Sequence, residues 1–272
     1  MKFLSRFYIA LIFLILYAPI LVVILFSFNR SGSLSQFSGF SFYWYRELFR
    51  DGEALKALKN SLILAVLSSL LATVLGTLCA FTIDRSKRKW FAHSVETVTN
   101  IPMMNPDIVT GVSMMLLFVG VAGLLKTASL LGFWTMLIAH TTFNLPYVTL
   151  SVLPKLRQMD NSLSEAALDL GCTPAQTFFR VELPSILPGV LSGLMMSFTL
   201  SLDDFVISHF VSSADFRTLP LYIYNQTAHE VKFSMYALCT LIILVILALL
   251  IAVNFAGSVG QRRQRRKVGA RG

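Results

Sequence analysis

Residues 7–28 form a run of 22 residues without one charged side chain. About 20 helical residues cross the hydrocarbon core of a bilayer, so this run is long enough to span one as an α-helix. Only 14% of all residues are charged and 55% are hydrophobic, whereas soluble domains carry about 25% charged residues. The sequence therefore predicts an all-α, polytopic integral membrane protein.

Five further apolar runs predict a bundle of six transmembrane helices in a single domain over residues 1–256, followed by a basic tail at 257–272. The third span is expected to be irregular, because Pro102 and Pro106 lie within it. Residues 29–60 contain Trp44 and Tyr45, which favour the membrane–water interface, so this segment is expected to lie along it. The expected spans are residues 7–28, 61–83, 98–125, 129–153, 185–208 and 234–255.

The positions of the basic residues predict an orientation. Lys2 and Arg6 precede the first run as in a signal peptide, but the run is too long and lacks a small-residue cleavage site. With both termini in the cytoplasm, 15 of the 23 Lys and Arg residues lie on that side, including the cluster at residues 85–89 and the tail. This clustering beside span ends also argues against a nucleic-acid partner, despite the net charge of +9.

A polar loop over residues 154–184 separates the fourth and fifth predicted spans and carries unusually complete helix signals. Ser162 with Glu165 three residues later forms a capping-box pattern, which predicts the start of a short helix. Gly171 fits a helix C′ position, and Thr173 followed by proline predicts a second start. Because Pro184 disfavours the α conformation before it, the second helix is expected to end near Leu183.

The same loop resembles the EAA signature of binding-protein-dependent ABC importer permeases. In that family the loop inserts into a cleft on the cytoplasmic ATPase and couples ATP turnover to the transmembrane helices. The resemblance implies a coupling role for Glu165, Ala166, Ala167, Gly171, Val181, Leu183 and Pro184. Val181 stands where Ile is usual, and Cys172 where Ala is commoner. The alternative is an ordinary cytoplasmic helical hairpin in which Glu165 only caps a helix.

The predicted spans contain three acidic residues, Asp107, Asp203 and Asp204, and no Lys or Arg. A charge near the bilayer centre costs at least about 2.5 kcal/mol on insertion scales, so such groups usually face a cavity or a partner. Three acids without an internal cation predict a pathway for a cationic substrate. The alternative is that Asp203 and Asp204 are solvated at the exterior interface.

Aromatic and polar side chains near these acids are secondary candidates. Tyr147 and Phe205 offer cation–π contacts to a cationic substrate, although interface anchoring would also explain them. His140 and Asn144 are expected to act as interhelical hydrogen-bond partners rather than substrate ligands.

Further segments resemble spermidine/putrescine importer permeases: residues 198–208 (FTLSLDDFVIS), 105–111 (NPDIVTG), 17–20 (YAPI), 27–29 (SFN) and 219–221 (LPL). The chain resembles the shorter of the two permeases in these systems. The resemblance implies a bacterial inner membrane location and a polyamine substrate. It also implies three kinds of partner: a second permease, two ATPase subunits that hydrolyse the ATP, and a periplasmic substrate-binding protein.

Patterns typical of enzymes, cofactor sites and metal sites are missing from the sequence. It has no Walker A, G-x-S-x-G or H-E-x-x-H pattern, and its three cysteines form no Cys-x-x-Cys pair. A cofactor, a metal and an enzymatic activity in this chain are therefore not expected. Two other functions stay open: an ABC importer for ferric iron, an oxyanion or an amino acid, and a cation-coupled secondary transporter or channel.

Overall fold

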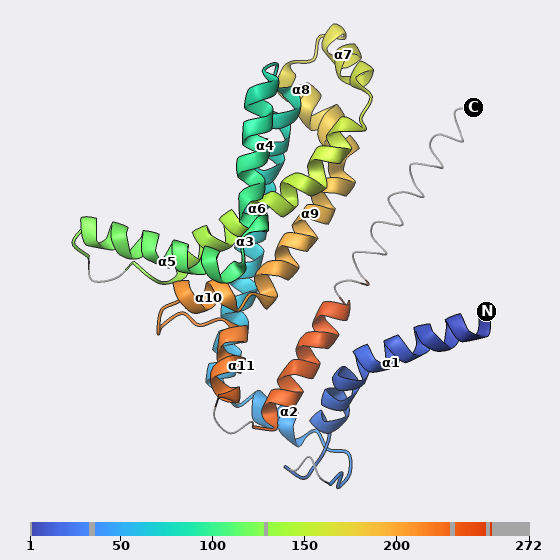
Figure 1. The fold of residues 1–272 in the computed structure, drawn as a ribbon, viewed down its shortest axis with the longest axis vertical. Coiled ribbons are helices and arrows are strands. Elements are labelled where there is room, and N and C mark those ends of the chain that lie inside the picture. Colours follow the sequence, from blue (N-terminus) through green and yellow to red (C-terminus); the bar gives the residue numbers. More distant parts are fainter. Residues whose placement is uncertain (1, 33–35, 128–129, 229–231, 249–250, 252–272) are drawn as a thin grey trace. The chain divides into compact units, whose positions relative to one another are not determined.

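The computed structural model describes residues 2–32, 36–127, 130–228, 232–248 and 251. Within these residues the fold is all-α, as predicted, and the only β pairing is an isolated bridge between Asn29 and Phe40. The helices, shown in Figure 1, are α1 (Lys2–Ser27), α2 (Tyr43–Leu48), α3 (Gly52–Arg85), α4 (Lys89–Met104), α5 (Asp107–Leu124), α6 (Phe133–Arg157), α7 (Asn161–Asp169), α8 (Pro174–Thr177), the π-helical turn η1 (Phe178–Glu182), α9 (Leu183–Asp203), α10 (Val206–Val211), α11 (Leu219–Thr227) and a helix over Ser234–Ala248.

Five of the described helical segments are long and apolar enough to cross a membrane. They are Arg6–Ser27, Gly52–Arg85, Asp107–Leu124, Phe133–Arg157 and Pro174–Asp203. The helix over Ser234–Ala248 corresponds to the start of the predicted sixth span. The rest of that span, except residue 251, and the basic tail lie outside the described residues.

The chain divides into two compact units, Met1–Leu55 with Ile223–Gly272, and Lys56–Tyr222. In the first unit, the buried Asn29 organises the turn after α1. Its Nδ2 donates to the carbonyl of Gln36 at 2.8 Å, and its Oδ1 accepts the backbone N–H of Ser38 at 3.0 Å. The indole N–H of Trp44 donates to the Asn29 carbonyl at 2.7 Å, so α2 is tied to the same turn.

The second unit is built around α6, which packs antiparallel to α9 along most of its length. Two glycines of α9 permit this close packing. A Cβ at Gly193 would lie 3.1 Å from the Cα of Val148, and one at Gly189 would lie 2.8 Å from the Ser151 carbonyl oxygen. Small residues at the crossing let the two backbones approach, as is common between membrane helices.

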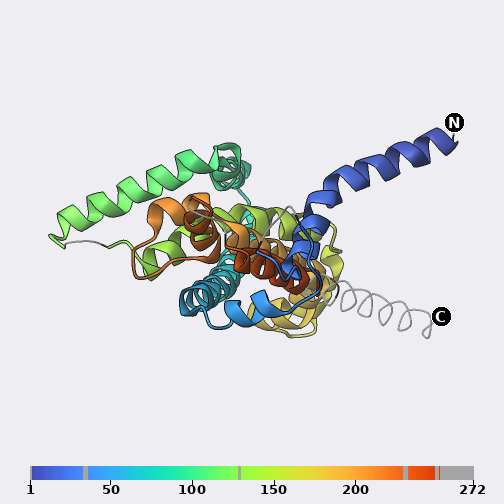
Figure 2. The same ribbon diagram turned by 90° about the horizontal axis from the view of Figure 1, so that it is seen from below.

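Helix α5 extends away from α6 and α9 in both Figure 1 and Figure 2. Its contacts are mainly with α10, where Gly111 lies against Val206, Ile207 and Phe210. Most of its other apolar side chains are exposed, including Leu116. Within the second unit, the first turns of α5 are therefore held in place by their packing against α10.

The third predicted span is irregular, as expected. It is two helices, α4 and α5, separated by Asn105 and Pro106. Asn105 is extended, with φ −82° and ψ 142°, and Pro106 occupies the N-cap position of α5. A proline disfavours the α conformation of the residue before it, which explains the break. The other proline in this region, Pro102, stays inside α4 without ending it.

The boundaries of three other spans also differ from the prediction. The second begins at Gly52 rather than 61, because the polar residues before it continue the helix. The fourth is α6, Phe133–Arg157, displaced by about a turn from the predicted 129–153. The fifth begins with Pro174 in the loop and ends at Asp203, after which the chain breaks before α10.

Candidate coupling loop and substrate pathway

The first helix of the loop, α7, is capped by Asp160, not by the predicted Ser162. The Asp160 carboxylate accepts the backbone N–H of Ser162 at 3.0 Å. Hydrogen bonds from the backbone and then the side chain of Ser162 hold the pKa of Asp160 below its usual value. Both residue types are good N-caps, and because Asp160 comes first, Ser162 becomes the second residue of the helix.

The end of α7 follows the prediction closely. Gly171 has φ +85°, and its N–H donates to the Leu168 carbonyl at 2.9 Å. The N–H of Cys172 donates to the Ala167 carbonyl at 3.1 Å. This pair of bonds is a Schellman motif with glycine in the left-handed position, so α7 ends in a tight reversal of the chain.

The second helix also begins as predicted. The Thr173 hydroxyl accepts from the Gln176 N–H at 3.3 Å, and the Gln176 side chain accepts from the Thr173 N–H at 3.0 Å. With Pro174 as the first helical residue, this is a complete capping box.

The predicted end of that helix near Leu183 is wrong. The chain passes through the π turn η1, in which the Leu183 N–H donates to the Phe178 carbonyl, and continues directly into α9. Pro184 is the second residue of α9, directly after this turn. Local proline rules do not anticipate a π turn that carries the helix past this point.

The predicted coupling residues lie on this continuous loop with different exposures. Only Ala167 is buried, and two of the residues, Val181 and Leu183, are half-buried. The other four are exposed: Glu165, Ala166, Gly171 and Pro184. Four large apolar side chains also project from the loop, since Leu168 is 43% exposed, Leu163 50%, Phe179 65% and Leu170 86%. A polar cytoplasmic hairpin has no need for such side chains, whereas a surface that packs into another protein does.

The predicted pathway acids lie at two helix breaks. Asp107 is the first residue of α5 and is exposed, close enough to Tyr147 of α6 to interact with it electrostatically. Asp203 is the last residue of α9 and is also exposed. The packing of α5 on α10 places both breaks in the same part of the second unit.

Asp204 differs from its neighbour, because its side chain is only 8% exposed. Its carboxylate accepts the backbone N–H of Ile207 at 3.2 Å and that of Ser208 at 2.8 Å, which caps α10. Its Oδ2 also lies 3.5 Å from Nε2 of His140. Asp204 is therefore held inside the unit, whereas Asp203 is exposed.

The prediction of His140 as an interhelical hydrogen-bond partner is confirmed. Its Nδ1 lies 2.8 Å from the Ser201 hydroxyl, and its Nε2 lies 3.2 Å from that of Ser208. Ser201 in turn lies 2.9 Å from the Ser68 hydroxyl. One buried polar chain thus joins α3, α6, α9 and α10. The side chain of Asn144 is fully buried, and no hydrogen-bond partner for it is found among the described residues.

The remaining candidate aromatics lie beside these groups. Phe205 lies in the break itself, with its ring centroid 5.4 Å from that of His209. Tyr147 is half-buried, 5.5 Å from Phe143 by ring centroids. Both rings are close to a helix break that carries an exposed carboxylate.

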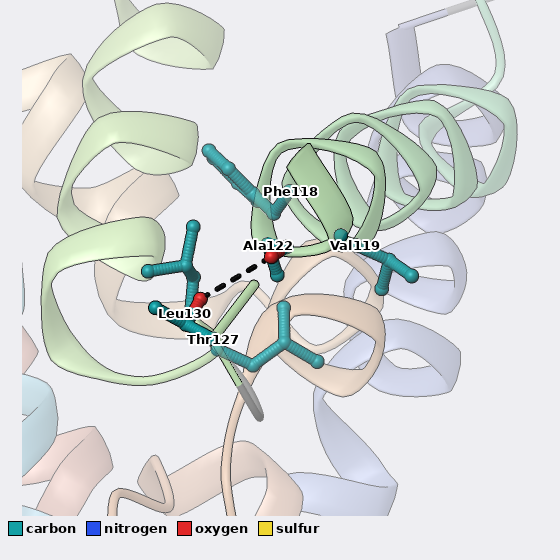
Figure 3. A pocket seen from close by; sticks show the side chains of 7 residues that line it. Phe118, Val119, Ala122, Thr127 and Leu130 are labelled. Carbon is teal, nitrogen blue, oxygen red and sulfur yellow. Dashed lines mark hydrogen bonds between the residues drawn. The ribbon is translucent and has the colours of Figure 1, made fainter. Parts of the chain in front are cut away.

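A cavity of about 240 Å³ lies near the other end of α5 (Figure 3). Phe118 and Ala122 of α5 form one wall and Leu130 another, and the Thr127 hydroxyl donates to the Ala122 carbonyl at 3.4 Å. The lining has no charged residue, so the cavity offers nothing to offset the charge of a cation.

Sequence reasoning missed one buried acid of the loop, Glu182, which is 5% exposed. Its partners are Ser164, 18 residues away, and Arg85, 97 residues away. A single acid in a polar loop gives no sign of such burial. The only hint is that Arg85 is one of a basic cluster directly after the second span.

Comparison with known proteins finds relatives that are named as transport system permeases. The putrescine transport system permease protein PotI of Escherichia coli (strain K12) is 38% identical over 231 residues, which are 85% of this chain and 82% of that protein. The spermidine/putrescine transport system permease protein PotC of Haemophilus influenzae (strain ATCC 51907 / DSM 11121 / KW20 / Rd) is 37% identical over 251 residues, 92% of this chain and 94% of that one.

Solved structures support the fold. A bacterial ABC transporter that imports the acidic polysaccharide alginate superposes with a TM-score of 0.74 at 17% identity, covering 96% of this chain and 95% of that chain. The MetNI methionine ABC transporter in an inward-facing conformation gives 0.56 at 19% identity, covering 82% and 98%. The fold is that of an ABC transporter permease.

These findings confirm the resemblance seen in the sequence. The relatives are transport permeases, so the chain is a multi-pass inner membrane protein that acts in transport and is not an enzyme, and ATP is hydrolysed by partner ATPases. Residues 72–267 match the family described as binding-protein-dependent transport system inner membrane component. The match covers more than half of the chain, which therefore belongs to this family.

Proposed function

We propose that the chain is the shorter permease subunit of an ATP-driven importer for polyamines, putrescine or spermidine. The observation that carries this proposal is a pair of helix breaks with exposed carboxylates, Asp107 and Asp203, on helices α5 and α9 that contain no Lys or Arg. A polyvalent organic cation supplies the missing positive charge. The names of the relatives PotI and PotC support the same substrate class.

In this proposal Asp107, Asp203 and Tyr147 line the route, with Phe205 at the break. Asp204 acts there indirectly, because its hydrogen bonds to the start of α10 keep the break open beside Asp203. Tyr147 and Phe205 offer aromatic faces to the amines, a contact worth about 0.5–2 kcal/mol. Membership of the family leaves no place for the secondary-transporter alternative.

The predicted coupling residues would shape the surface that binds the ATPase. They are Glu165, Ala166, Ala167, Gly171, Val181, Leu183 and Pro184. Exposed Leu170 and Phe179 would fill a cleft on that partner, and the second helix, continuous with α9, would carry its movement into the membrane. The complete importer would contain a second permease, two ATPase subunits and a periplasmic binding protein. Residues 1–256 would form the single permease domain.

Uptake of labelled putrescine and spermidine tests the proposal. The chain should be expressed with its partner subunits in cells that lack their own polyamine importers, and cells without this chain serve as the control. We expect ATP-dependent uptake of at least one of the two polyamines. Uptake of an unrelated cargo alone would instead favour an importer for ferric iron, an oxyanion or an amino acid.

The orientation of the chain in the membrane can be tested by thiol labelling. The background is a variant in which the native Cys79, Cys172 and Cys239 are replaced by Ser. With both termini in the cytoplasm, Ser38→Cys should react with a membrane-impermeant thiol reagent in intact cells. Lys87→Cys should react only after the membrane is permeabilised. The reverse labelling pattern would place the loop of residues 154–184 outside, where no ATPase could reach it.

A further inference from the structure

The buried carboxylate of Glu182 connects two parts of the chain that lie far apart in sequence. Its Oε1 accepts the hydroxyl hydrogen of Ser164 on α7 at 2.9 Å. The same oxygen accepts a hydrogen bond from the guanidinium of Arg85, the last residue of α3, which makes an ion pair. Ser164 directly precedes the Glu165-Ala166-Ala167 triplet, so one atom joins the first helix of the loop to a membrane helix.

The burial of this acid makes the arrangement specific. Glu182 and Ser164 are 5% and 4% exposed, whereas the Arg85 side chain is 49% exposed. A buried carboxylate is costly unless it is paired and hydrogen-bonded, so Glu182 favours the geometry in which both partners stay in place. Next to it, the rings of Phe81 on α3 and Phe178 on η1 meet edge to face at 4.9 Å.

The π turn explains how Glu182 comes to face α3. A π turn contains one more residue than an α turn, which shifts the helix by one position, about 100° around its axis. Glu182 ends this turn and is buried, while Phe179, three residues earlier in the same turn, is exposed. Glu182 also lies between the signature positions Val181 and Leu183 without being one of them.

We propose that Glu182 is a positioning residue that transfers movement of the docked loop to α3 through Arg85. The proposal rests on the coupling role proposed above for the seven residues between Glu165 and Pro184. Without the ion pair, the loop would still bind the ATPase through its exposed side chains and would still move α9, with which it is continuous. The movement of α3 would then no longer follow that of the loop.

The test uses the reconstituted complex of this chain, the second permease, the ATPases and the binding protein. Glu182→Gln keeps an oxygen for the Ser164 hydroxyl and removes the charge that holds Arg85. We expect the ATPases to co-purify normally, and we expect the number of polyamine molecules imported per ATP hydrolysed to fall at least about fivefold, the lower end of usual coupling between sites. Stimulation of ATP hydrolysis by the binding protein should fall as well.

Glu96→Gln is the matched control. It removes the acid of another ion pair, between Glu96 on α4 and Arg157 on α6 at 3.3 Å, which does not involve α7 or Glu182. This variant should keep the wild-type ratio of transport to hydrolysis. The double variant Arg85→Glu/Glu182→Arg restores the charge pair in reverse and should recover a substantial part of the ratio.

Three results would overturn the proposal: a wild-type ratio in Glu182→Gln, an equal loss in Glu96→Gln, or no recovery in the double variant. Stimulation by the purified binding protein reports the link whatever its cargo. A wild-type complex that shows stimulation but imports neither putrescine nor spermidine would refute the proposed substrate and leave the test of Glu182 valid.

Discussion

Replacing Gly171 with Val is expected to abolish most transport while the protein still inserts into the membrane. Gly171 has φ +85°, a conformation that costs a residue with a Cβ about 1–2 kcal/mol and a β-branched one more. That cost corresponds to a 5- to 30-fold smaller population of the tight reversal between α7 and α8. Uptake and co-purification of the ATPase should fall together, whereas the amount of chain in the membrane should not change.

The structure offers a control that separates backbone conformation from bulk. A Cβ at Gly171 would meet no atom within 4 Å, so a larger side chain has room. Gly171→Asn should therefore retain most activity, because Asn tolerates the left-handed conformation. If the Asn and Val variants fail equally, or if Val transports normally, the reversal at Gly171 is not what the ATPase recognises.

The second large effect is expected from Asp203→Asn. Asp203 is exposed at the end of α9, so an amide of the same size should leave expression and the thermal midpoint near those of the wild type. Loss of its charge should lower polyamine uptake about tenfold, as expected if one carboxylate contributes about 1.4 kcal/mol to cation binding. Asp203→Glu should retain more uptake than Asp203→Asn, because it keeps the charge.

Asp204→Asn, one residue along the chain, should behave differently. An Asn has one acceptor oxygen where Asp204 uses two for the N–H groups of Ile207 and Ser208. We expect a loss of stability of about 1 kcal/mol, and uptake that falls only as far as the amount of folded protein does. Wild-type uptake in Asp203→Asn with a specific transport defect in a stable Asp204→Asn would reverse the two assignments.

Local rules predicted those parts of the loop whose structure is set within a few residues. Gly171 and Thr173 behave as expected because a left-handed cap and a capping box involve only neighbours in the chain. The N-cap of α7 was misplaced because Asp160 and Ser162 both suit that position. The continuation past Pro184 was missed because it depends on a π turn, for which no residue type is a reliable signal.

Long-range contacts decide the roles that the sequence could not separate. Asp203 and Asp204 are the same residue type side by side. In the structure only Asp204 lies beside His140, about 60 residues earlier in the chain, and accepts the N–H groups that begin α10. Likewise, the burial of Glu182 depends on Arg85 at the end of another helix. The lack of Lys and Arg in the segments that form α5 and α9, by contrast, can be read directly from the sequence.

The close packing of α6 on α9 has a mechanical consequence. Where Gly189 and Gly193 leave no space between the two backbones, the helices cannot slide or separate without losing that contact, so they behave as one stiff arm. With 25 residues, α6 is about 37 Å long. A tilt of about 5° at its loop end would displace His140, about 25 Å away, and the break after Asp203 beside it by about 2 Å. A displacement of this size would let a small rotation of an ATPase open or close the proposed passage.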